Sequence, residues 1–390
     1  MDKRPVTLIY DPIMFKGGSK VATSDALAQC NPQTQRFIVL TADKQYWQKS
    51  EFHQLHDAKI YSLPLCKWTS KHHNGLLYWF EQLIATVVVL FFMVRFYQTS
   101  QLLGASGPGI DMPLYLIKKL TGKRVIQWVH GNVGLSRSIG YCLVNADAVF
   151  FLPSTKRSIQ NAIEQYFWSS LNTGDVGALS ELFIQSENYF ETVNGITESR
   201  WPTPCQRDIP VGFWAASLLK WKGVDTLIDA VKLAHTLHPM PFNICYIQPQ
   251  STNMPVSNAP VDLPHTQWHQ DPIDLDEIRR QSNIFVSTSH NEPFGLSILE
   301  ALAAGMCVLI PSDNAYWDQV LTHNENCVKY QPNDVDSLCD ALLYVFNDKQ
   351  AMQRCCQNGL DIAQQYKASV RYDTFARYLC RHSATVEQHA

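Results

Sequence analysis

One stretch in the second half of the chain brings together groups that could bind a phosphorylated ligand. It extends from Ser289 to Gly305 (SHNEPFGLSILEALAAG) and contains Glu292 and Glu300. An apolar segment precedes it and a helical pattern follows, so part of its backbone is expected at the N-terminus of a helix. The N–H groups of such a terminus attract anions, nucleotide phosphates included. The amides expected there are those of Phe294, Gly295 and Leu296.

The two glutamates of this stretch are suited to the hydroxyl groups of a ligand. A carboxylate that accepts from two vicinal ribose hydroxyls makes a charge-assisted, bidentate contact. A glycosidase pair is one alternative, but eight helical residues span roughly 12 Å, and glycosidase carboxyl groups lie about 5 to 9.5 Å apart. Two solvated glutamates without a function are another alternative, which leaves the strand, loop and helix around them unexplained.

The elements around this stretch alternate between strand and helix. In the first half we expect strands at Val6–Tyr10, Arg36–Thr41, Gln101–Ala105, Arg124–Val129 and Ala148–Leu152. Helices are expected from the Phe15–Ser19 loop to Gln29, at Met112–Leu120, and after Ala148–Leu152 with Ser154 as its cap. Such interleaving predicts an α/β fold with a parallel, doubly wound sheet.

The alternation stops at Ile196–Val211, which contains Pro202, Pro204 and Pro210 and is predicted to be a linker. It then restarts, with strands expected at Gly212–Leu218, Phe242–Ile247, Ile284–Ser287 and Cys307–Ile310. The helices expected between them are Val224–Leu237, Asp274–Gln281 and Leu296–Ala304. Two such arrays would direct the carboxyl ends of their strands, and hence their ligand sites, toward a shared cleft.

The spacing of Glu292 and Glu300, with Pro-Phe-Gly-Leu between them and Glu-Ala-Leu-Ala-Ala-Gly at the end, resembles the E-x7-E signature of retaining glycosyltransferase family four. The resemblance extends with gaps through nearly the whole chain and is best from Val211 to Val320. It implies a GT-B fold, two Rossmann-like domains facing across a cleft, with a nucleotide-sugar donor and retention of anomeric configuration. The implied domains are 1–195 for the acceptor, a linker 196–211, 212–365 for the nucleotide sugar, and a C-terminal helix 366–390 packed on the first domain.

The resemblance also implies roles for individual residues. Glu292 would contact the donor sugar and Glu300 the ribose hydroxyls, while Lys222, followed by Gly223, would bind the diphosphate. His130, at the end of a strand, matches a histidine near the C6 hydroxyl of the donor sugar; taken alone, it would be a structural histidine. Gly17 and Gly18 resemble a glycine loop that meets the diphosphate or the acceptor, although any tight turn uses such a pair. Asn194-Gly195 resembles a family motif and is more simply a turn.

The chain departs from the family pattern at Ser217, because the family has an arginine five residues before the lysine. Lys220 is expected to supply the missing charge, without the planar fork of arginine.

Asp274-Leu275-Asp276 spells the metal-binding D-x-D of another glycosyltransferase fold. At the start of a helix, aspartates cap free amides and match the helix dipole. We therefore predict no metal and no cofactor besides the donor substrate.

The composition and net charge of the chain bear on which kinds of molecule it could bind. The chain has 390 residues, 46% of them hydrophobic and 17% charged, with a net charge of −3. These values favour large cores and give no electrostatic reason to expect nucleic acid. Eleven cysteines are spread without zinc-binding spacing, as is usual for free thiols in a reducing cytosol.

An uncharged segment, Leu83–Val94, could contact a membrane. It is shorter than the roughly 20 residues of a spanning helix. Leu76, Phe80, Leu83, Val87 and Phe91 repeat at helical spacing and are predicted to face the core. An interfacial helix and a true span are the alternatives, and Lys67, Lys71, His72 and His73 form a basic cluster nearby.

The sequence thus predicts a retaining glycosyltransferase that moves a sugar from a UDP- or GDP-sugar to a glycan or glycolipid acceptor. By analogy of family it would act in bacterial surface polysaccharide or lipopolysaccharide synthesis, in the cytoplasm and at the inner face of the membrane. Two alternatives stay open. One is an inactive nucleotide-sugar-binding subunit of a transferase complex, and the other is an epimerase, hydrolase or phosphorylase of nucleotide sugars on the same fold.

Overall fold

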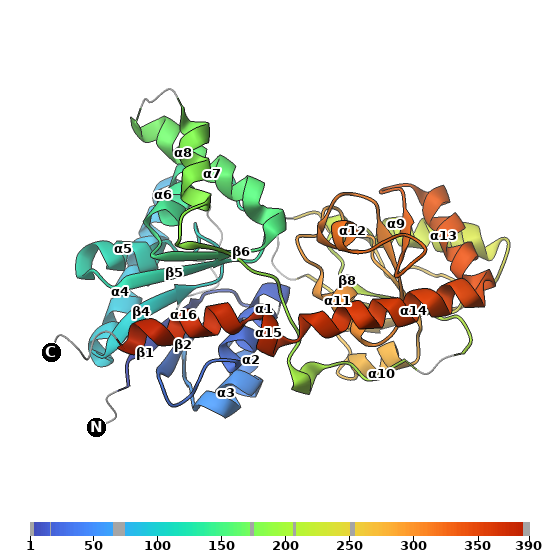
Figure 1. Ribbon diagram of the computed structural model, residues 1–390, viewed down its shortest axis with the longest axis horizontal. Coiled ribbons are helices and arrows are strands. Elements are labelled where there is room, and N and C mark those ends of the chain that lie inside the picture. Colours follow the sequence, from blue (N-terminus) through green and yellow to red (C-terminus); the bar gives the residue numbers. More distant parts are fainter. Residues whose placement is uncertain are drawn as a thin grey trace. The chain divides into compact units, whose positions relative to one another are not determined.

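The computed structural model describes residues 4–15, 17–64, 75–171, 175–205, 208–249 and 254–384. The chain forms two compact units (Figure 1). The first comprises residues 1–195 and 368–390, and the second comprises residues 196–367. Each unit is built on its own parallel sheet, and each is described below by itself.

The first unit contains a seven-stranded sheet in the order β3-β2-β1-β4-β5-β6-β7, with all neighbours parallel. Its strands are β1 Val6–Asp11, β2 Arg36–Thr41, β3 Lys59–Ser62, β4 Thr99–Gly104, β5 Arg124–Val129, β6 Ala148–Phe151 and β7 Tyr189–Glu191. Its helices are α1 Gly18–Ala28, α2 Lys44–Lys49, α3 Glu51–His56, α4 Gly75–Arg95, α5 Met112–Thr121, α6 Arg137–Asn145, α7 Lys156–Leu171, α8 Val176–Ile184, α15 Ala368–Arg371 and α16 Asp373–Ala384.

Both faces of this sheet are covered, which explains the nearly continuous apolar strands. Alternate residues of a strand point to opposite faces, so Leu8 packs in one core with α4 and α5, and Ile9 packs in the other core with α1. The second core also takes in the chain's C-terminal segment, through Tyr372, Phe375 and Leu379. The aromatic ring of Phe375 lies 4.2 Å from that of Trp128, measured between centroids.

Helix α4 corrects the predicted orientation of the apolar segment. The side packed inside carries Tyr78, Glu81, Gln82, Ala85, Thr86, Val89 and Met93. The predicted core-facing residues lie on the exposed side instead: Leu76 is 90% exposed, Val87 66% and Phe91 63%. The helix is apolar nearly all round, so hydrophobic periodicity alone does not decide which side packs. The packed side contacts α5 and shares one core with residues of the sheet.

By length and composition, α4 is also long and apolar enough to cross a membrane. Of its most apolar 18-residue stretch, 39% is buried inside the protein. A core helix of a globular domain can be equally long and apolar. The basic residues Lys67, Lys71, His72 and His73 lie outside the described residues.

The second unit contains a six-stranded parallel sheet in the order β10-β9-β8-β11-β12-β13. Its strands are β8 Gly212–Ser217, β9 Phe242–Ile247, β10 Thr266–Gln270, β11 Ile284–Val286, β12 Cys307–Pro311 and β13 Val328–Tyr330. Its helices are α9 Val224–His235, α10 Leu275–Arg280, α11 Leu296–Ala303, α12 Tyr316–Val320, α13 Val335–Asn347 and α14 Lys349–Ala363.

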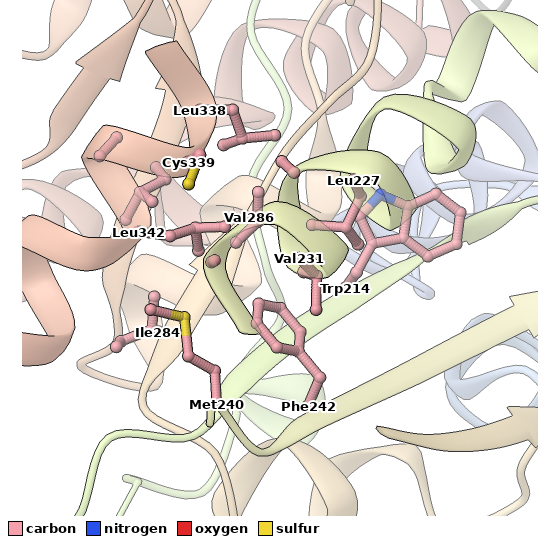
Figure 2. Packing of buried hydrophobic residues seen from close by; sticks show 14 of the residues in the cluster. Trp214, Leu227, Val231, Met240, Phe242, Ile284, Val286, Leu338, Cys339 and Leu342 are labelled. Atoms are coloured by element: carbon pink, nitrogen blue, oxygen red, sulfur yellow. The ribbon is translucent and has the colours of Figure 1, made fainter. Parts of the chain in front are cut away.

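The core of the second unit joins α9 and α13 to one face of this sheet (Figure 2). Leu227 and Val231 from α9 and Leu338 and Leu342 from α13 are fully buried against the strands. Gly212 begins β8 where space is tight, because a Cβ there would lie 2.3 Å from the ring of Phe242.

The predicted α/β class with two doubly wound sheets is confirmed. Two local details differ. A 3-10 turn, Pro153–Thr155, comes between β6 and α7, so Ser154 is not the cap of that helix. Residues of the predicted linker pack within the second unit: the amide of Ile196 donates to Tyr366 (2.9 Å) and that of Cys205 to Ala304 (2.8 Å).

Candidate functional site

The order of the second sheet locates its ligand edge. The switch point of the sheet lies between the neighbouring strands β8 and β11, because the chain adds β9 and β10 on one side of β8 and then β11, β12 and β13 on the other. In open parallel sheets, ligands bind at the carboxyl ends of the strands beside such a switch point. The loops that leave β8 and β11 there run to α9 and α11. They carry Lys222 and Glu292, two of the residues that the sequence predicted for donor binding.

These two loops are joined by close contacts. The Thr288 hydroxyl donates to the carbonyl of Lys222 (2.8 Å), and the His290 amide donates to the carbonyl of Trp221 (2.8 Å). Gly223 has φ +71°, and a Cβ there would lie 2.1 Å from the carbonyl oxygen of Thr288. Only glycine fits this position, both by backbone conformation and by space. The first loop is thereby fixed against the second.

The turn from β11 into α11 presents free backbone donors. Gly295 precedes α11 with φ +76°, and no side chain caps the helix. Within the described residues, the amides of Phe294, Gly295 and Leu296 have no protein hydrogen-bond acceptor. The Phe294 side chain is buried against Tyr316 and Trp317, so it anchors the turn and leaves its amide as the group available to a ligand. Free amides at a helix N-terminus form an anion site.

Glu292 and Lys222 form an ion pair across the two loops. Their side chains are only 16% and 18% exposed, respectively. The sequence predicted a sugar contact for the glutamate and a diphosphate contact for the lysine, and it did not predict that they bind each other. A pocket beside Glu292, lined also by Ser287, Ser289 and Asp313, has room for about one water, near 10 Å³.

Glu300 lies on α11 and binds two arginines. Its Oε1 accepts from Arg200 Nη2 and its Oε2 from Arg279 Nη2, each at 2.8 Å. Arg279 also donates to Asp276 Oδ1 at 2.9 Å. Neither arginine was predicted from the sequence. No local spacing signals them, because Arg200 lies 100 residues before Glu300.

Ser217 is the last residue of β8, and Lys220 lies on the loop that follows it. Lys220 is exposed, and among the described residues its ammonium has no hydrogen-bond or ion-pair partner. A ligand at this edge of the sheet could therefore recruit it without breaking a protein contact. Ser217 is partly buried.

The predicted helix cap at Asp274 and Asp276 is corrected in part. Asp274 stands at the N-cap of α10, but its side chain accepts no capping hydrogen bond. Asp276 accepts from the amide of Thr203 (3.2 Å) as well as from Arg279. Among the residues that the structure describes, no three His, Cys, Asp or Glu side chains are grouped as metal ligands.

In the first unit His130 follows β5, as predicted. Its Nε2 lies 2.9 Å from the Thr23 hydroxyl, which itself donates to the carbonyl of Ser19 (2.9 Å). Because the hydroxyl proton is used, Nε2 carries the imidazole proton and Nδ1 is left as an acceptor. Nδ1 is buried and has no hydrogen-bond partner. Burial lowers the pKa of His130 to about 3, so the ring is neutral. Thr23, which fixes the tautomer, was not predicted.

Gly17 and Gly18 stand at the start of α1. Gly17 is the N-cap with φ −130°, and Gly18 is the first helical residue. A Cβ on Gly17 would meet only ordinary contacts, the nearest at 3.4 Å to the Phe15 ring. The backbone conformation therefore does not require glycine at position 17, and a role in approaching a ligand stays a prediction.

A buried lysine, also missed, fixes the loop between β1 and α1. Lys20 on α1 donates to the carbonyl of Ile13 (2.7 Å) and pairs with Asp11 (3.1 Å) and Asp43 (3.3 Å). Asp11 further accepts from the indole of Trp47 at 2.7 Å. Since buried charges must be paired to be tolerated, this network holds the loop that contains Gly17.

The second unit resembles a known family of transferases. Residues 196–361 match the family model described as glycosyl transferases group 1. Matching curated relatives include probable sucrose-phosphate synthase 1 of Citrus unshiu, 35% identical over 98 residues, and sucrose-phosphate synthase of Zea mays, 32% identical over 96 residues. Each match covers 24% of this chain and 9% of the relative's length.

Solved structures are similar over almost the whole chain. Anabaena HepE in complex with UDP-glucose has a TM-score of 0.69 at 14% identity, covering 96% of this chain and 99% of that one. Sucrose-phosphate synthase from Thermosynechococcus elongatus has a TM-score of 0.67 at 14% identity, and the match covers 99% of this chain and 100% of that one. The lipopolysaccharide outer core galactosyltransferase WaaB has a TM-score of 0.62 at 14% identity, and the match covers 96% of this chain and 98% of that one. The chain therefore has the GT-B fold of glycosyltransferases, and residues 196–361 match their group 1 family.

Proposed function

We propose that the chain is a retaining glycosyltransferase that moves a sugar from a nucleotide-sugar donor to an acceptor hydroxyl. The observation that carries the proposal is the arrangement at the β8–β11 switch point. There, the free amides of Phe294, Gly295 and Leu296 accompany the paired side chains of Lys222 and Glu292. Free amides and an ammonium suit a diphosphate, and a carboxylate suits a sugar hydroxyl or developing positive charge.

The diphosphate of the donor would take Lys222 from Glu292, or share it. In either case the carboxylate of Glu292 gains freedom to face the sugar when the donor binds. The amides at the start of α11 need no rearrangement, because they have no protein acceptor among the described residues. Lys220 would add positive charge where Ser217 stands in place of the family's arginine. The roles predicted for His130, Gly17 and Gly18 remain predictions.

In the proposed reaction the bond between the anomeric carbon and the diphosphate oxygen breaks, and the acceptor oxygen bonds to that carbon from the same face. The electron pair of the broken bond leaves with the diphosphate, where Lys222, Lys220 and the amides stabilise its charge. The acceptor's proton passes to the leaving phosphate, so we assign no general base. Glu292 stabilises the positive charge that develops on the sugar. The reaction requires no cofactor in this proposal.

For the donor we favour UDP- or GDP-sugars, and for the acceptor a glycan or glycolipid. The UDP-glucose complex of HepE and the outer core activity named for WaaB support this choice and the proposed pathway of surface polysaccharide or lipopolysaccharide synthesis. An inactive donor-binding subunit would retain nucleotide binding without transfer. An epimerase or hydrolase would convert the donor without an acceptor.

We also propose a cytoplasmic protein that touches the membrane surface through the exposed side of α4. Large apolar side chains gather along that side, among them Leu76, Leu83, Val87, Phe91 and Val94. Contiguous exposed apolar surface of this kind marks an interaction site. Trp79 and Tyr97 are exposed near its two ends, as aromatic residues are at membrane interfaces.

The test is a thermal-shift panel of UDP, GDP, ADP and their sugar conjugates, followed by a transfer assay with the donor that binds. A ligand at a hundred times its dissociation constant adds about 2.7 kcal/mol of stability. No shift with any nucleotide would overturn the proposal. Binding without turnover would favour the inactive subunit, and donor consumption that is independent of acceptor would favour the epimerase or hydrolase. The anomeric configuration of the product, read by NMR, tests retention.

A further inference from the structure

The contacts of Glu300 point to two different roles for its arginine partners. Arg279 is 7% exposed in its side chain and is held at both ends of its guanidinium, by Glu300 Oε2 and by Asp276 Oδ1. A planar guanidinium that binds two carboxylates has a fixed orientation. Arg279 therefore fixes the plane in which the Glu300 carboxylate lies.

Arg200 approaches the other oxygen from a different setting. Its side chain is 34% exposed, and it stands at the end of a short 3-10 turn, Glu198–Arg200. Water can solvate this guanidinium if it leaves Glu300, whereas Arg279 has no such access. Of the two partners, Arg200 is thus the one that solvent and a ligand can reach more easily.

A carboxylate has about four lone-pair positions on two oxygens. Both oxygens of Glu300 already accept from an arginine, and its side chain is only 16% exposed. Two vicinal ribose hydroxyls need acceptor positions on the accessible edge of the same group. Departure of Arg200 opens Oε1 for them without disturbing the bond between Oε2 and Arg279.

We propose that Arg279 is a positioning residue, which orients Glu300 toward the ribose, and that Arg200 is an exchangeable partner whose place on Oε1 the ribose hydroxyls take. The inference rests on the proposed function, because it takes Glu300 as the ribose ligand. It adds that selectivity for ribose over deoxyribose depends on Arg279, a residue that need not touch the nucleotide.

The experiment measures the affinities of UDP and 2′-deoxy-UDP by calorimetric titration and compares their ratio between variants. If the wild type binds GDP instead, the guanosine pair is used. Loss of one hydrogen bond to a charged group lowers affinity about tenfold or more, so the wild type should prefer UDP by that factor. Arg279→Gln should bring the ratio close to one, and Arg279→Lys, which keeps the charge without the fork, should lower it. Arg200→Gln should keep the ratio and bind UDP at least as tightly as the wild type.

Arg280→Gln is the matched control, because Arg280 is the next residue on α10 and pairs with Glu277 rather than with Glu300. It should behave as the wild type does. Asp276→Asn provides a second route if Arg279→Gln does not fold: its side chain is 46% exposed, and its loss should loosen Arg279 and lower the ratio part of the way. Thermal unfolding, measured on each variant, separates a loss of selectivity from a loss of fold.

The outcomes separate this inference from the proposed function. If the wild type binds neither nucleotide, or binds both equally, the assignment of Glu300 as the ribose ligand is wrong. If the wild type prefers UDP over 2′-deoxy-UDP and the Arg279 and Asp276 variants prefer it equally, Arg279 does not position Glu300. The proposed donor function would be unaffected. If Arg200→Gln loses the preference for UDP, Arg200 is a ribose ligand or a second positioning residue, and the proposed exchange is wrong.

Discussion

Lys222 and Glu292 come from loops on neighbouring strands and neutralise each other at the switch point of the second sheet. In the proposed function Lys222 would bind the diphosphate and Glu292 would contact the sugar. The pair therefore holds both groups ready in the absence of donor, and it avoids an unpaired charge at a largely buried position. Changes to either partner should act on different steps of the reaction.

Glu292→Gln should lower kcat by about ten- to a hundredfold or more while the nucleoside diphosphate still binds about as well as to the wild type. The lost contact strengthens as positive charge develops on the sugar, and one charge-assisted contact contributes about 1.5–3 kcal/mol. Steady-state kinetics and calorimetry of the nucleotide measure the two effects separately. Full activity in this variant would show that the carboxylate has no role in transfer.

The sequence predicted the parts of this site that are local in the chain. Glu292, the amides from Phe294 and Glu300 lie on one strand-turn-helix segment, so their order in the chain determines much of their geometry. Arg200 and Arg279 reach Glu300 only after folding, and no pattern within a window of the chain could have indicated them.

Helix α4 shows the same limit for packing. Its sequence is apolar on nearly every side, and the exposed side is the more hydrophobic one. The packed side includes Glu81, Gln82 and Thr86, each at most 8% exposed. Hydrophobic periodicity assumes that the larger apolar side chains face inward, and this helix does not meet that assumption.

Lys220→Ala should weaken the binding of free nucleoside diphosphate, and Ser217→Arg should leave it equal or tighter. The ammonium of Lys220 is the exposed positive charge on the loop that follows Ser217. Calorimetric titration measures both changes. Lys232→Ala, an exposed lysine on α9 that pairs with Asp229, serves as the control for a general loss of charge. Unchanged affinity in Lys220→Ala would mean that Lys222 and the amides suffice.

Chelation by EDTA should leave transfer activity unchanged. Of the D-x-D residues, Asp276 is engaged by Arg279 and by the amide of Thr203, so metal binding there would have to break an ion pair. Asp274→Asn should likewise keep activity. A complete loss of activity with EDTA that manganese restores would contradict this prediction and the assignment of these aspartates.

His130→Gln should make the stability of the protein less dependent on pH between about 3 and 6.5. Desolvation of the ring lowers the pKa of His130 to about 3, against about 6.5 in an unfolded chain. Between these values the unfolded state binds a proton that the folded state does not, so the wild type loses stability as the pH falls through this range. The glutamine amide removes this titration and can still donate to Thr23. Thermal unfolding at pH 7 and pH 4.5 gives the comparison, and equal losses in both proteins would show that His130 does not contribute.

The exposed side of α4 should bind vesicles that contain anionic lipid. The full chain should float with such vesicles at low salt, because burial of apolar surface contributes about 25 cal/mol per Å² and anionic lipid attracts basic residues near the surface. Val87→Glu with Phe91→Glu should abolish flotation and leave thermal stability and donor binding unchanged, since both side chains are largely exposed. Leu237→Glu places one such charge on a similarly exposed leucine of the second unit and should float as the wild type does. If the wild type stays in the soluble fraction, or the double variant floats as well as the wild type, this side of α4 is not the membrane contact.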